Sequence, residues 1–199
     1  MAIKPILFNA EMVRAILDGR KACTRRILKG GIPFDEKAEY WNVLKKGEWS
    51  GPICVEHFIK YFSPYKPGDI LYVRETWSEW TGGYLYKAWT EPFPQAGALP
   101  GVKWSPSIHM PKEAARIWLK VTDVRVDRLH DITSEQICRE GTEVEEPFVL
   151  NGEEKRYAFS VLWNSTIKKS DLDRYGWEAN PWVWVIQFER CEKPEEERR

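Results

Sequence analysis

The densest cluster of chemically capable side chains lies near the N-terminus, where five cations occur within ten residues and no acid lies among them. These are Arg20, Lys21, Arg25, Arg26 and Lys29. The cluster follows a predicted helix end, so we expect it at a surface edge. Arg and Lys grouped in this way can hold the phosphates of a nucleic acid. A solvated basic face without a ligand explains the same pattern, and local charge alone does not separate the two interpretations.

Two other sets of residues could take part in chemistry. Arg74 and Glu75 are adjacent in a predicted strand. They could form an ion pair in a pocket, although the alternation of a strand also allows one of them to face solvent. His109 and His130 could transfer protons. Neither has the neighbouring pattern of a catalytic triad, although Asp131 follows His130, so we interpret both histidines as structural or exposed.

The cysteines do not indicate a metal site. The four are Cys23, Cys54, Cys138 and Cys191, and no two of them form a C-x-x-C pair. Cys54 with His57 is at best half of a zinc site, since structural zinc sites show paired spacings. We therefore expect reduced thiols, no metal and no cofactor, and a cytoplasmic location.

Composition excludes several classes of protein. The chain has 199 residues, 30 basic and 30 acidic side chains and a formal net charge of zero. A strongly basic nucleic-acid-binding protein is thus excluded for the chain as a whole. No apolar run is long enough for a transmembrane helix, and residues 1–10 do not resemble a secretory signal. The 11 Trp, 8 Tyr and 8 Phe indicate a β-rich core, with a few rings free to line a pocket for a flat ligand.

The elements that must position these residues are short and irregularly spaced. Asn9 is a typical N-terminal cap and Gly19 a typical C-terminal stop for a first helix between them. Residues 20–28 are predicted to form a turn that leads into a strand. Thr133 begins a capping-box helix that stops at Gly141. Further elements are predicted as strands at 70–77, 115–121, 124–126 and 181–189, with a bulge between the middle two, and as a helix at 157–166.

The remaining segments have no clear period. We interpret residues 30–64, 78–110 and 143–156 as insertions, the second with a short hairpin through residues 84–86, and residues 193–199 as a charged tail. Because neither regular βαβ alternation nor a glycine-rich phosphate motif is present, the sequence argues against the Rossmann and P-loop folds. The order of elements favours an α+β fold: a small, mostly antiparallel β-barrel with flanking short helices and loop-rich insertions.

The order of several motifs resembles a known family, the ASCH domain, which has a PUA-like β-barrel. The matching stretches are Gly19-Arg20-Lys21-x-x-Thr24-Arg25-Arg26, Pro67 to Val73, Asp131 to Gly141 and the closing strand Trp182 to Phe188. The segments Lys103 to Pro111 and Asn180 to Trp184 resemble longer members from phages and prophages. The resemblance implies a single ASCH/PUA-like domain over residues 1–192.

The resemblance also implies a function. PUA-like domains commonly bind RNA, and one bacterial branch of the ASCH family hydrolyses the acetyl amide of N4-acetylcytidine with a Lys, a Thr three residues later and a distant Glu. Lys21, Thr24 and Glu140 occupy the matching positions. Thr24 would be the nucleophile, Lys21 the base and Glu140 the proton donor. This requires Lys21 to lie in the turn and Thr24 on the strand, since residues three apart in a strand face opposite ways.

Three functions follow as hypotheses. The first is binding of RNA or a modified nucleoside, with Arg20, Arg25, Arg26, Arg74 and Glu75 as binding residues. The second is an amidohydrolase that acts on an N4-acylated cytidine-type nucleoside, with the three catalytic residues named above. The third is a phage-encoded protein–protein interaction module that uses the Trp-rich insertions. No membrane partner is expected.

Overall fold

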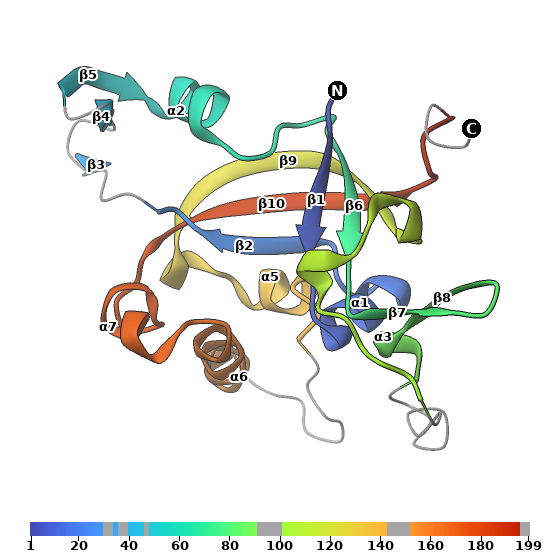
Figure 1. The fold of residues 1–199 in the computed structure, drawn as a ribbon. Helices are drawn as coiled ribbons and strands as arrows, with labels where there is room; N and C mark the ends of the chain where they lie inside the picture. The colour runs from blue at the N-terminus through green and yellow to red at the C-terminus, as the bar shows by residue number, and fades with distance from the viewer. Residues whose placement is uncertain (30–33, 36–39, 46–47, 91–100, 143–151, 196–199) are drawn as a thin grey trace.

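The centre of the molecule is a mixed five-stranded sheet (Figure 1). The computed structural model describes residues 1–199 except 30–33, 36–39, 46–47, 91–100, 143–151 and 196–199. The sheet has the order β1 (Ile3–Leu7), β6 (Ile70–Arg74), β9 (Trp118–Arg128), β10 (Trp182–Cys191) and β2 (Cys23–Ile27). Only the β1–β6 pairing is parallel. The predicted α+β class is confirmed, whereas no closed barrel is found in the described residues.

The two longest strands carry the predicted bulge. Phe188 of β10 pairs with Val121 of β9, but the preceding residue, Gln187, pairs with Asp123. Thr122 is therefore the extra residue in β9. A bulge bends its strand and increases the local twist, and Figure 1 shows β9 and β10 curving together over the helices below them.

Strand β1 is an element that the sequence analysis missed. Its centre is Pro5, which lacks the amide proton that a ladder needs, and a proline argues against a central strand. The structure places β1 at an edge of the sheet, where it pairs with β6 alone. Pro5 is thus tolerated because one side of an edge strand needs no hydrogen bonds.

The helices that matter for the site lie below the sheet in Figure 1. They are α1 (Ala10–Leu17), α5 (Ser134–Arg139), α6 (Gly152–Ser165) and α7 (Leu172–Tyr175). The predicted caps are present: Asn9 Oδ1 accepts from the amide of Met12 at 2.8 Å, and Thr133 forms a capping box with Gln136. Gly141 follows α5 with φ +78°, the left-handed conformation of a helix-terminating glycine.

Two buried clusters join these layers. The larger one includes Ile6, Val13, Leu71, Leu119 and Ile186, from α1 and four strands. The smaller one packs α5 and α6 on β10 through Leu129, Ile132, Ile137, Phe159, Trp163, Val183 and Val185. The smaller cluster fixes α6 against the sheet and so holds two aromatic rings close to β2.

The expected insertions contain more regular structure than predicted. The segment 30–64 holds β3 (Phe34–Asp35), β4 (Tyr40–Lys45), β5 (Glu48–Cys54) and α2 (Val55–Phe62). Trp41 and Phe58 stack at 4.3 Å between ring centroids, and Phe58 stacks on Trp184 at 5.4 Å. This lobe is therefore attached to the main sheet by aromatic packing, which a search for hydrophobic periodicity does not detect.

The other two insertions are also corrected in part. The segment 78–110 contains the predicted hairpin, formed by β7 (Trp77–Trp80) and β8 (Gly83–Tyr86), followed by α3 (Lys87–Thr90). Of the third insertion, residues 143–151 lie outside the described residues, and the rest is helical because α6 begins at Gly152. Short 3₁₀ turns occur at Ser107–His109, Lys112–Ala114, Leu129–Asp131 and Lys169–Asp171.

The turn before β6 is held by the buried carboxylate of Asp69. It accepts hydrogen bonds from Lys4 Nζ at 2.7 Å, from the amide of Ala2 at 2.9 Å and from the amide of Lys66 at 3.1 Å. Burial alone would raise the pKa of Asp69, but these hydrogen bonds and the charge of Lys4 outweigh it, so the pKa is lowered.

Because its pKa is lowered on folding, Asp69 stabilises the protein above the pKa of an unfolded aspartate, about 4, and the contribution is lost as pH falls further. We expect Asp69→Asn to lower the free energy of unfolding at pH 7 and to have a smaller effect at pH 3. Denaturant titrations at both values measure this. Asp18→Asn, at an exposed ion pair, is the control, and an Asp69→Asn effect that is equal at both pH values would contradict the prediction.

Candidate functional site

The most unusual feature of the interior is a buried cluster of two cations and one carboxylate. Lys21 Nζ lies 2.9 Å from Glu140 Oε2, and Arg25 NH1 lies 2.9 Å from Glu140 Oε1. The side chains of Lys21, Arg25 and Glu140 are 0%, 1% and 5% exposed, respectively. Such groups are rarely buried unless they are paired. Glu140 therefore pairs with both cations and is the centre of the cluster, which keeps an excess of one positive charge.

The chain builds this cluster where the end of α5 meets the start of β2. Lys21 and Glu140 form an isolated antiparallel bridge, and the amide of Ala22 donates to the carbonyl of Arg139 at 2.9 Å. Lys21 Nζ also donates to the carbonyl of Glu140 at 2.8 Å. Lys21 thus precedes β2 and Thr24 lies on β2, which is the arrangement that the predicted catalytic roles require.

Gly141 permits this close packing. A Cβ atom at position 141 would lie 2.6 Å from the Cβ of Ala15 and 2.9 Å from the Cβ of Lys21. The backbone there is also left-handed. Only glycine meets both conditions without displacement of its neighbours.

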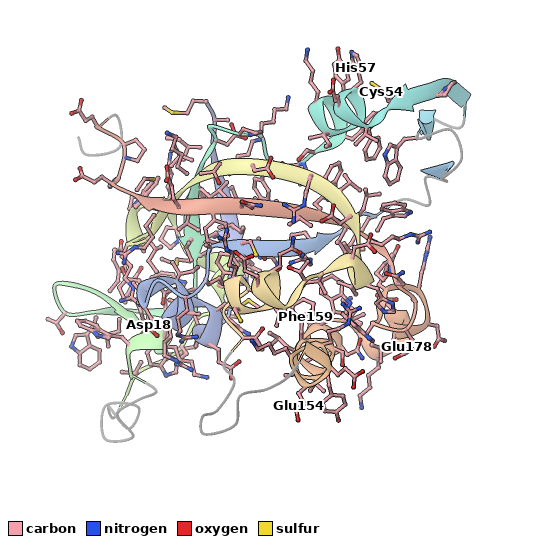
Figure 2. All side chains as sticks on the ribbon, turned by 180° about the vertical axis from the view of Figure 1, so that it is seen from behind. Asp18, Cys54, His57, Glu154, Phe159 and Glu178 are labelled. Atoms are coloured by element: carbon pink, nitrogen blue, oxygen red, sulfur yellow. The ribbon has the colours of Figure 1, made fainter. Side chains whose placement is uncertain are left out.

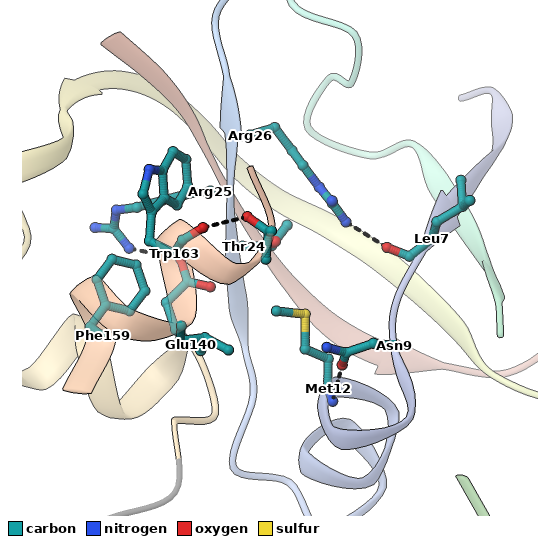
Figure 3. Close-up of a pocket in the computed structure, with 11 residues that line it drawn as sticks. Leu7, Asn9, Met12, Thr24, Arg25, Arg26, Glu140, Phe159 and Trp163 are labelled. Atoms are coloured by element: carbon teal, nitrogen blue, oxygen red, sulfur yellow. Dashed lines mark hydrogen bonds and ion pairs between the residues drawn. The ribbon is translucent and has the colours of Figure 1, made fainter. Parts of the chain in front are cut away.

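A cavity of ≈ 150 Å³ opens beside the cluster (Figure 3). Its polar lining includes Thr24, Arg25, Arg26 and Glu140, and its apolar lining includes the rings of α6. The full set is Leu7, Asn9, Met12, Thr24, Arg25, Arg26, Glu140, Phe159, Leu162, Trp163 and Thr166. The cavity therefore brings a hydroxyl group, a carboxylate and two guanidinium groups together with aromatic surface.

The three predicted catalytic residues are close but not equivalent. Thr24 and Glu140 both line the cavity, whereas Lys21 is not part of its lining and lies against Glu140. Lys21 Nζ is also 5.5 Å from the centroid of the Phe8 ring. No hydrogen bond of the Thr24 hydroxyl occurs within the described ranges. The hydroxyl is thus available to a ligand, and Lys21 is connected to the cavity by its contact with Glu140.

The basic cluster is not the exposed edge that we expected. Lys21 and Arg25 are buried and paired, and Arg26 is held by the carbonyl of Leu7 at 2.7 Å. Burial lowers the pKa of Arg26, and the nearby Tyr65 and Glu140 oppose this shift. Arg20 is partly exposed and pairs with Asp18 at 2.9 Å; Lys29 is exposed. The prediction of a surface edge is wrong for the buried pair, since the partner Glu140 lies more than 110 residues further along the chain.

Arg74 and Glu75 do not pair with each other, and neither lines the cavity beside Glu140. Arg74 donates to the carbonyls of Met110, at 2.8 Å, and Ile108. The Glu75 side chain is 1% exposed. Its carboxylate accepts hydrogen bonds from Nε and NH2 of Arg116, at 2.9 and 3.0 Å. The pocket ion pair predicted for Arg74 and Glu75 is therefore wrong. Both residues instead hold the segment before β9 to the sheet.

The cysteines and histidines show no metal centre in the part of the chain that the structure describes. Cys54 Sγ, at the end of β5, lies 2.9 Å from Nδ1 of His57 on α2. Both residues lie away from Phe159 of α6 (Figure 2). His130 Nε2 contacts the carbonyl of Trp177 at 2.8 Å, a structural role. Burial, aided by the charge of Glu140, raises the pKa of Cys23 to about 12, so its thiol is a poor nucleophile.

Phe159 and Trp163 are the site residues that the sequence analysis missed. They lie four apart on α6, so they share one face of the helix. Trp163 Nε1 donates to the carbonyl of Tyr175 at 2.8 Å, which fixes the ring. The predicted helix at 157–166 contained both rings, but only the packing of α6 on the sheet shows which aromatic residues reach the cavity. Trp80 and Trp89 of the second insertion are instead exposed.

Comparisons with known proteins identify two solved structures that are distantly similar to this chain. No family model matches the sequence, and no curated protein matches it. The crystal structure of hypothetical protein PH0355 is similar with a TM-score of 0.38 and 16% identity, over 96% of this chain and 100% of that chain. An ASCH domain from Lactobacillus crispatus JV V101 has a TM-score of 0.37 and 12% identity, over 95% of this chain and 79% of that chain. Within the described ranges, no helix has both the length and the hydropathy needed to cross a bilayer.

Proposed function

We propose that the protein binds a modified pyrimidine nucleoside, with the base in the cavity beside Glu140. The observation that carries the proposal is the meeting of Thr24, Arg25 and Glu140 with two aromatic rings around one small cavity. Ligand sites typically combine apolar walls with a few placed polar groups. The chain is then a PUA-like domain of the ASCH type, in a longer phage-style form, as the motif order indicates.

The size of the cavity favours a single ring. In another protein, a cavity of about 150 Å³ binds benzene. The cavity beside Glu140 has ≈ 150 Å³, which suits one six-membered ring and is small for the two fused rings of a purine. Phe159 and Trp163 supply the aromatic surface on which a base can pack.

The polar lining suits the edge of a cytosine-type base. Arg25 Nε is buried without a hydrogen-bond partner in the described residues, and a ring carbonyl would satisfy this donor. Glu140 and the Thr24 hydroxyl can accept from an amino or amide N–H on the ring. A base without such groups would leave the buried donor unpaired, at a cost in affinity.

Titration calorimetry with N4-acetylcytidine, cytidine and adenosine tests the proposal. We expect the pyrimidine nucleosides to bind at least about tenfold more tightly than adenosine, because the purine overfills the cavity. Leu162→Trp, which places a large ring in the cavity wall, is expected to abolish binding. Equal affinity for adenosine, or full binding by Leu162→Trp, would refute the proposal.

Amide hydrolysis is the second candidate, and the contact between Lys21 and Glu140 favours it. Transfer of one proton within this 2.9 Å pair yields a neutral amine and a protonated carboxyl group, the base and the acid that hydrolysis needs. Thr24 Oγ1 would bond to the acyl carbon while its proton passes to the Glu140 carboxyl group, which gives its own proton back to Lys21. The bond from that carbon to N4 then breaks as Glu140 protonates N4, and water hydrolyses the Thr24 ester.

Release of cytidine from N4-acetylcytidine, followed by chromatography, measures this activity. Thr24→Val and Lys21→Met are each expected to abolish turnover, since nucleophile and base act as a unit. Thr122→Val makes the same change at the exposed bulge of β9 and should leave turnover unchanged. Turnover that survives Thr24→Val would refute the mechanism, while binding without turnover by the unaltered protein would leave binding as the function.

A further inference from the structure

The cavity beside Glu140 is surrounded by more positive than negative charge. Among the described residues, the ionisable side chains of its lining are Arg25, Arg26 and Glu140. Lys21 adds a further cation behind Glu140, with its Nζ at 2.9 Å from the carboxylate. One carboxylate therefore faces three cations, and the surroundings of the cavity keep an excess of positive charge.

Arg26 is the cation of this group that the protein compensates least. Its NH2 group donates to the carbonyl of Leu7 at 2.7 Å, and it forms no ion pair within the described part of the chain. Burial lowers the pKa of Arg26, although an arginine remains charged at pH 7. Its guanidinium carbon lies 5.3 Å from the centroid of the Phe8 ring, a contact that attracts a cation but does not cancel its charge. An anionic partner would offset part of the cost of burying this charge.

Strand β2 directs Arg26 to the same cavity as Thr24. The two residues are two apart on the strand, so their side chains leave it on the same face, and both line the cavity. Figure 3 shows the Arg26 side chain extending from β2 towards Leu7. A cytosine-type ring whose amino edge reaches Thr24 would therefore present the next ring position to Arg26.

The size of the cavity limits where a ligand can carry negative charge. The cavity has ≈ 150 Å³, which suits one six-membered ring, so only a small substituent on that ring can share it. The phosphate of a nucleotide is attached to the sugar and lies outside the space that the base fills. Glu11 lines only an adjoining chamber and is exposed, so solvent screens its charge. A carboxylate bonded to the ring is thus the anion that best fits beside Arg26.

We propose that the base bound in this cavity carries a carboxylate at the ring position next to its 4-amino group, and that Arg26 is the specificity residue that recognises it. This inference rests on the proposed nucleoside binding and names the class of modification. Arg26 has N–H groups beyond the one that it gives to Leu7, and a carboxylate accepts charge-assisted hydrogen bonds from them. The excess positive charge around the cavity favours the same ligand at longer range. Neutral pyrimidines enter the same cavity with lower affinity.

Calorimetric binding of 5-carboxycytidine and 5-carbamoylcytidine tests the proposal, because the two ligands have nearly the same shape and differ in charge. The unaltered protein should bind the carboxylate at least about tenfold more tightly than the carboxamide. Arg26→Gln should lower this ratio at least about threefold, whereas Arg26→Lys, which keeps the charge, should retain most of it.

Lys21→Met tests the effect of charge without removing a contact to the ligand, since Lys21 is not part of the cavity lining. Loss of this cation lowers the excess positive charge, and the ratio should fall. Lys29→Met makes the same change at an exposed position beyond the end of β2. It should leave the ratio as it is, because exposed charges are screened. If Arg26→Gln does not fold, Lys21→Met decides the test.

The outcomes separate this inference from the proposed function. If neither cytidine nor the two substituted nucleosides bind the unaltered protein, the proposed function itself fails. If cytidine binds but 5-carboxycytidine binds no more tightly than 5-carbamoylcytidine, only the anionic class is refuted. A ratio that Arg26→Gln leaves unchanged refutes the role of Arg26. Tighter binding of cytidine 5′-monophosphate than of 5-carboxycytidine, lost in Arg26→Gln, would place the anion on the sugar and contradict the proposal.

Discussion

Replacement of Glu140 by alanine is expected to lower the free energy of unfolding by about 3–5 kcal/mol, the usual cost of leaving a buried charge without its partner. Glu140 faces two such charges, because Lys21 and Arg25 are 0% and 1% exposed and both pair with it at 2.9 Å. Alanine also removes the carboxylate without offering another acceptor. Denaturant unfolding, followed by tryptophan fluorescence, measures the loss.

Glu135→Ala is the matched control for this change. Glu135 lies on the same helix and pairs with Arg139 at the surface, where both side chains are more than half exposed. Exposed pairs contribute about 0–1 kcal/mol. If Glu140→Ala prevents folding, Glu140→Gln is measured instead. Adding Lys21→Met to Glu140→Gln should then recover part of the stability that Glu140→Gln loses, because it removes one uncompensated cation. A loss below about 1 kcal/mol for Glu140→Ala would contradict the description of the cluster.

Gly141→Ala is expected to cost about 2–5 kcal/mol. A left-handed conformation costs a non-glycine residue about 1–2 kcal/mol, and Gly141 has φ +78°. Overpacking adds about 1–3 kcal/mol, because the new Cβ would lie 2.6 Å from the Cβ of Ala15. The same displacement would move Lys21 relative to Glu140, so ligand binding should fall with stability.

Gly19→Ala separates the two causes. Gly19 has a similar φ of +75°, but a Cβ there would meet nothing within 4 Å. Its replacement should therefore cost only the backbone strain, about 1–2 kcal/mol. Equal losses for the two variants, measured by thermal and denaturant unfolding, would show that the close approach at Gly141 does not matter.

Local signals in the sequence predicted much of the scaffold. The capping box at Thr133, the glycine ends of α1 and α5 and the bulge in β9 all depend on neighbouring residues, so the sequence contains the information directly. Strand β1 was missed since Pro5 argues against a strand unless its edge position is known. The lobe at residues 34–62 was missed because its strands are short and its packing is aromatic rather than periodic.

The candidate site was predictable only in part. The resemblance placed Lys21, Thr24 and Glu140 together, and the structure brings two of them to one cavity and pairs the third with Glu140. Local charge suggested that Lys21 and Arg25 are exposed, because the carboxylate that pairs with both of them is remote in the sequence. Phe159 and Trp163 could not be distinguished from the other aromatic residues until the packing of α6 on β10 was known.

A crystal structure of the protein with bound N4-acetylcytidine, or with cytidine if the ligand is hydrolysed, tests the central claim most directly. The account predicts the pyrimidine ring in the cavity against Phe159 and Trp163, with its polar edge within hydrogen-bond distance of Arg25 or Glu140. A nucleoside that binds elsewhere on the protein and does not enter the cavity beside Glu140 would contradict the account.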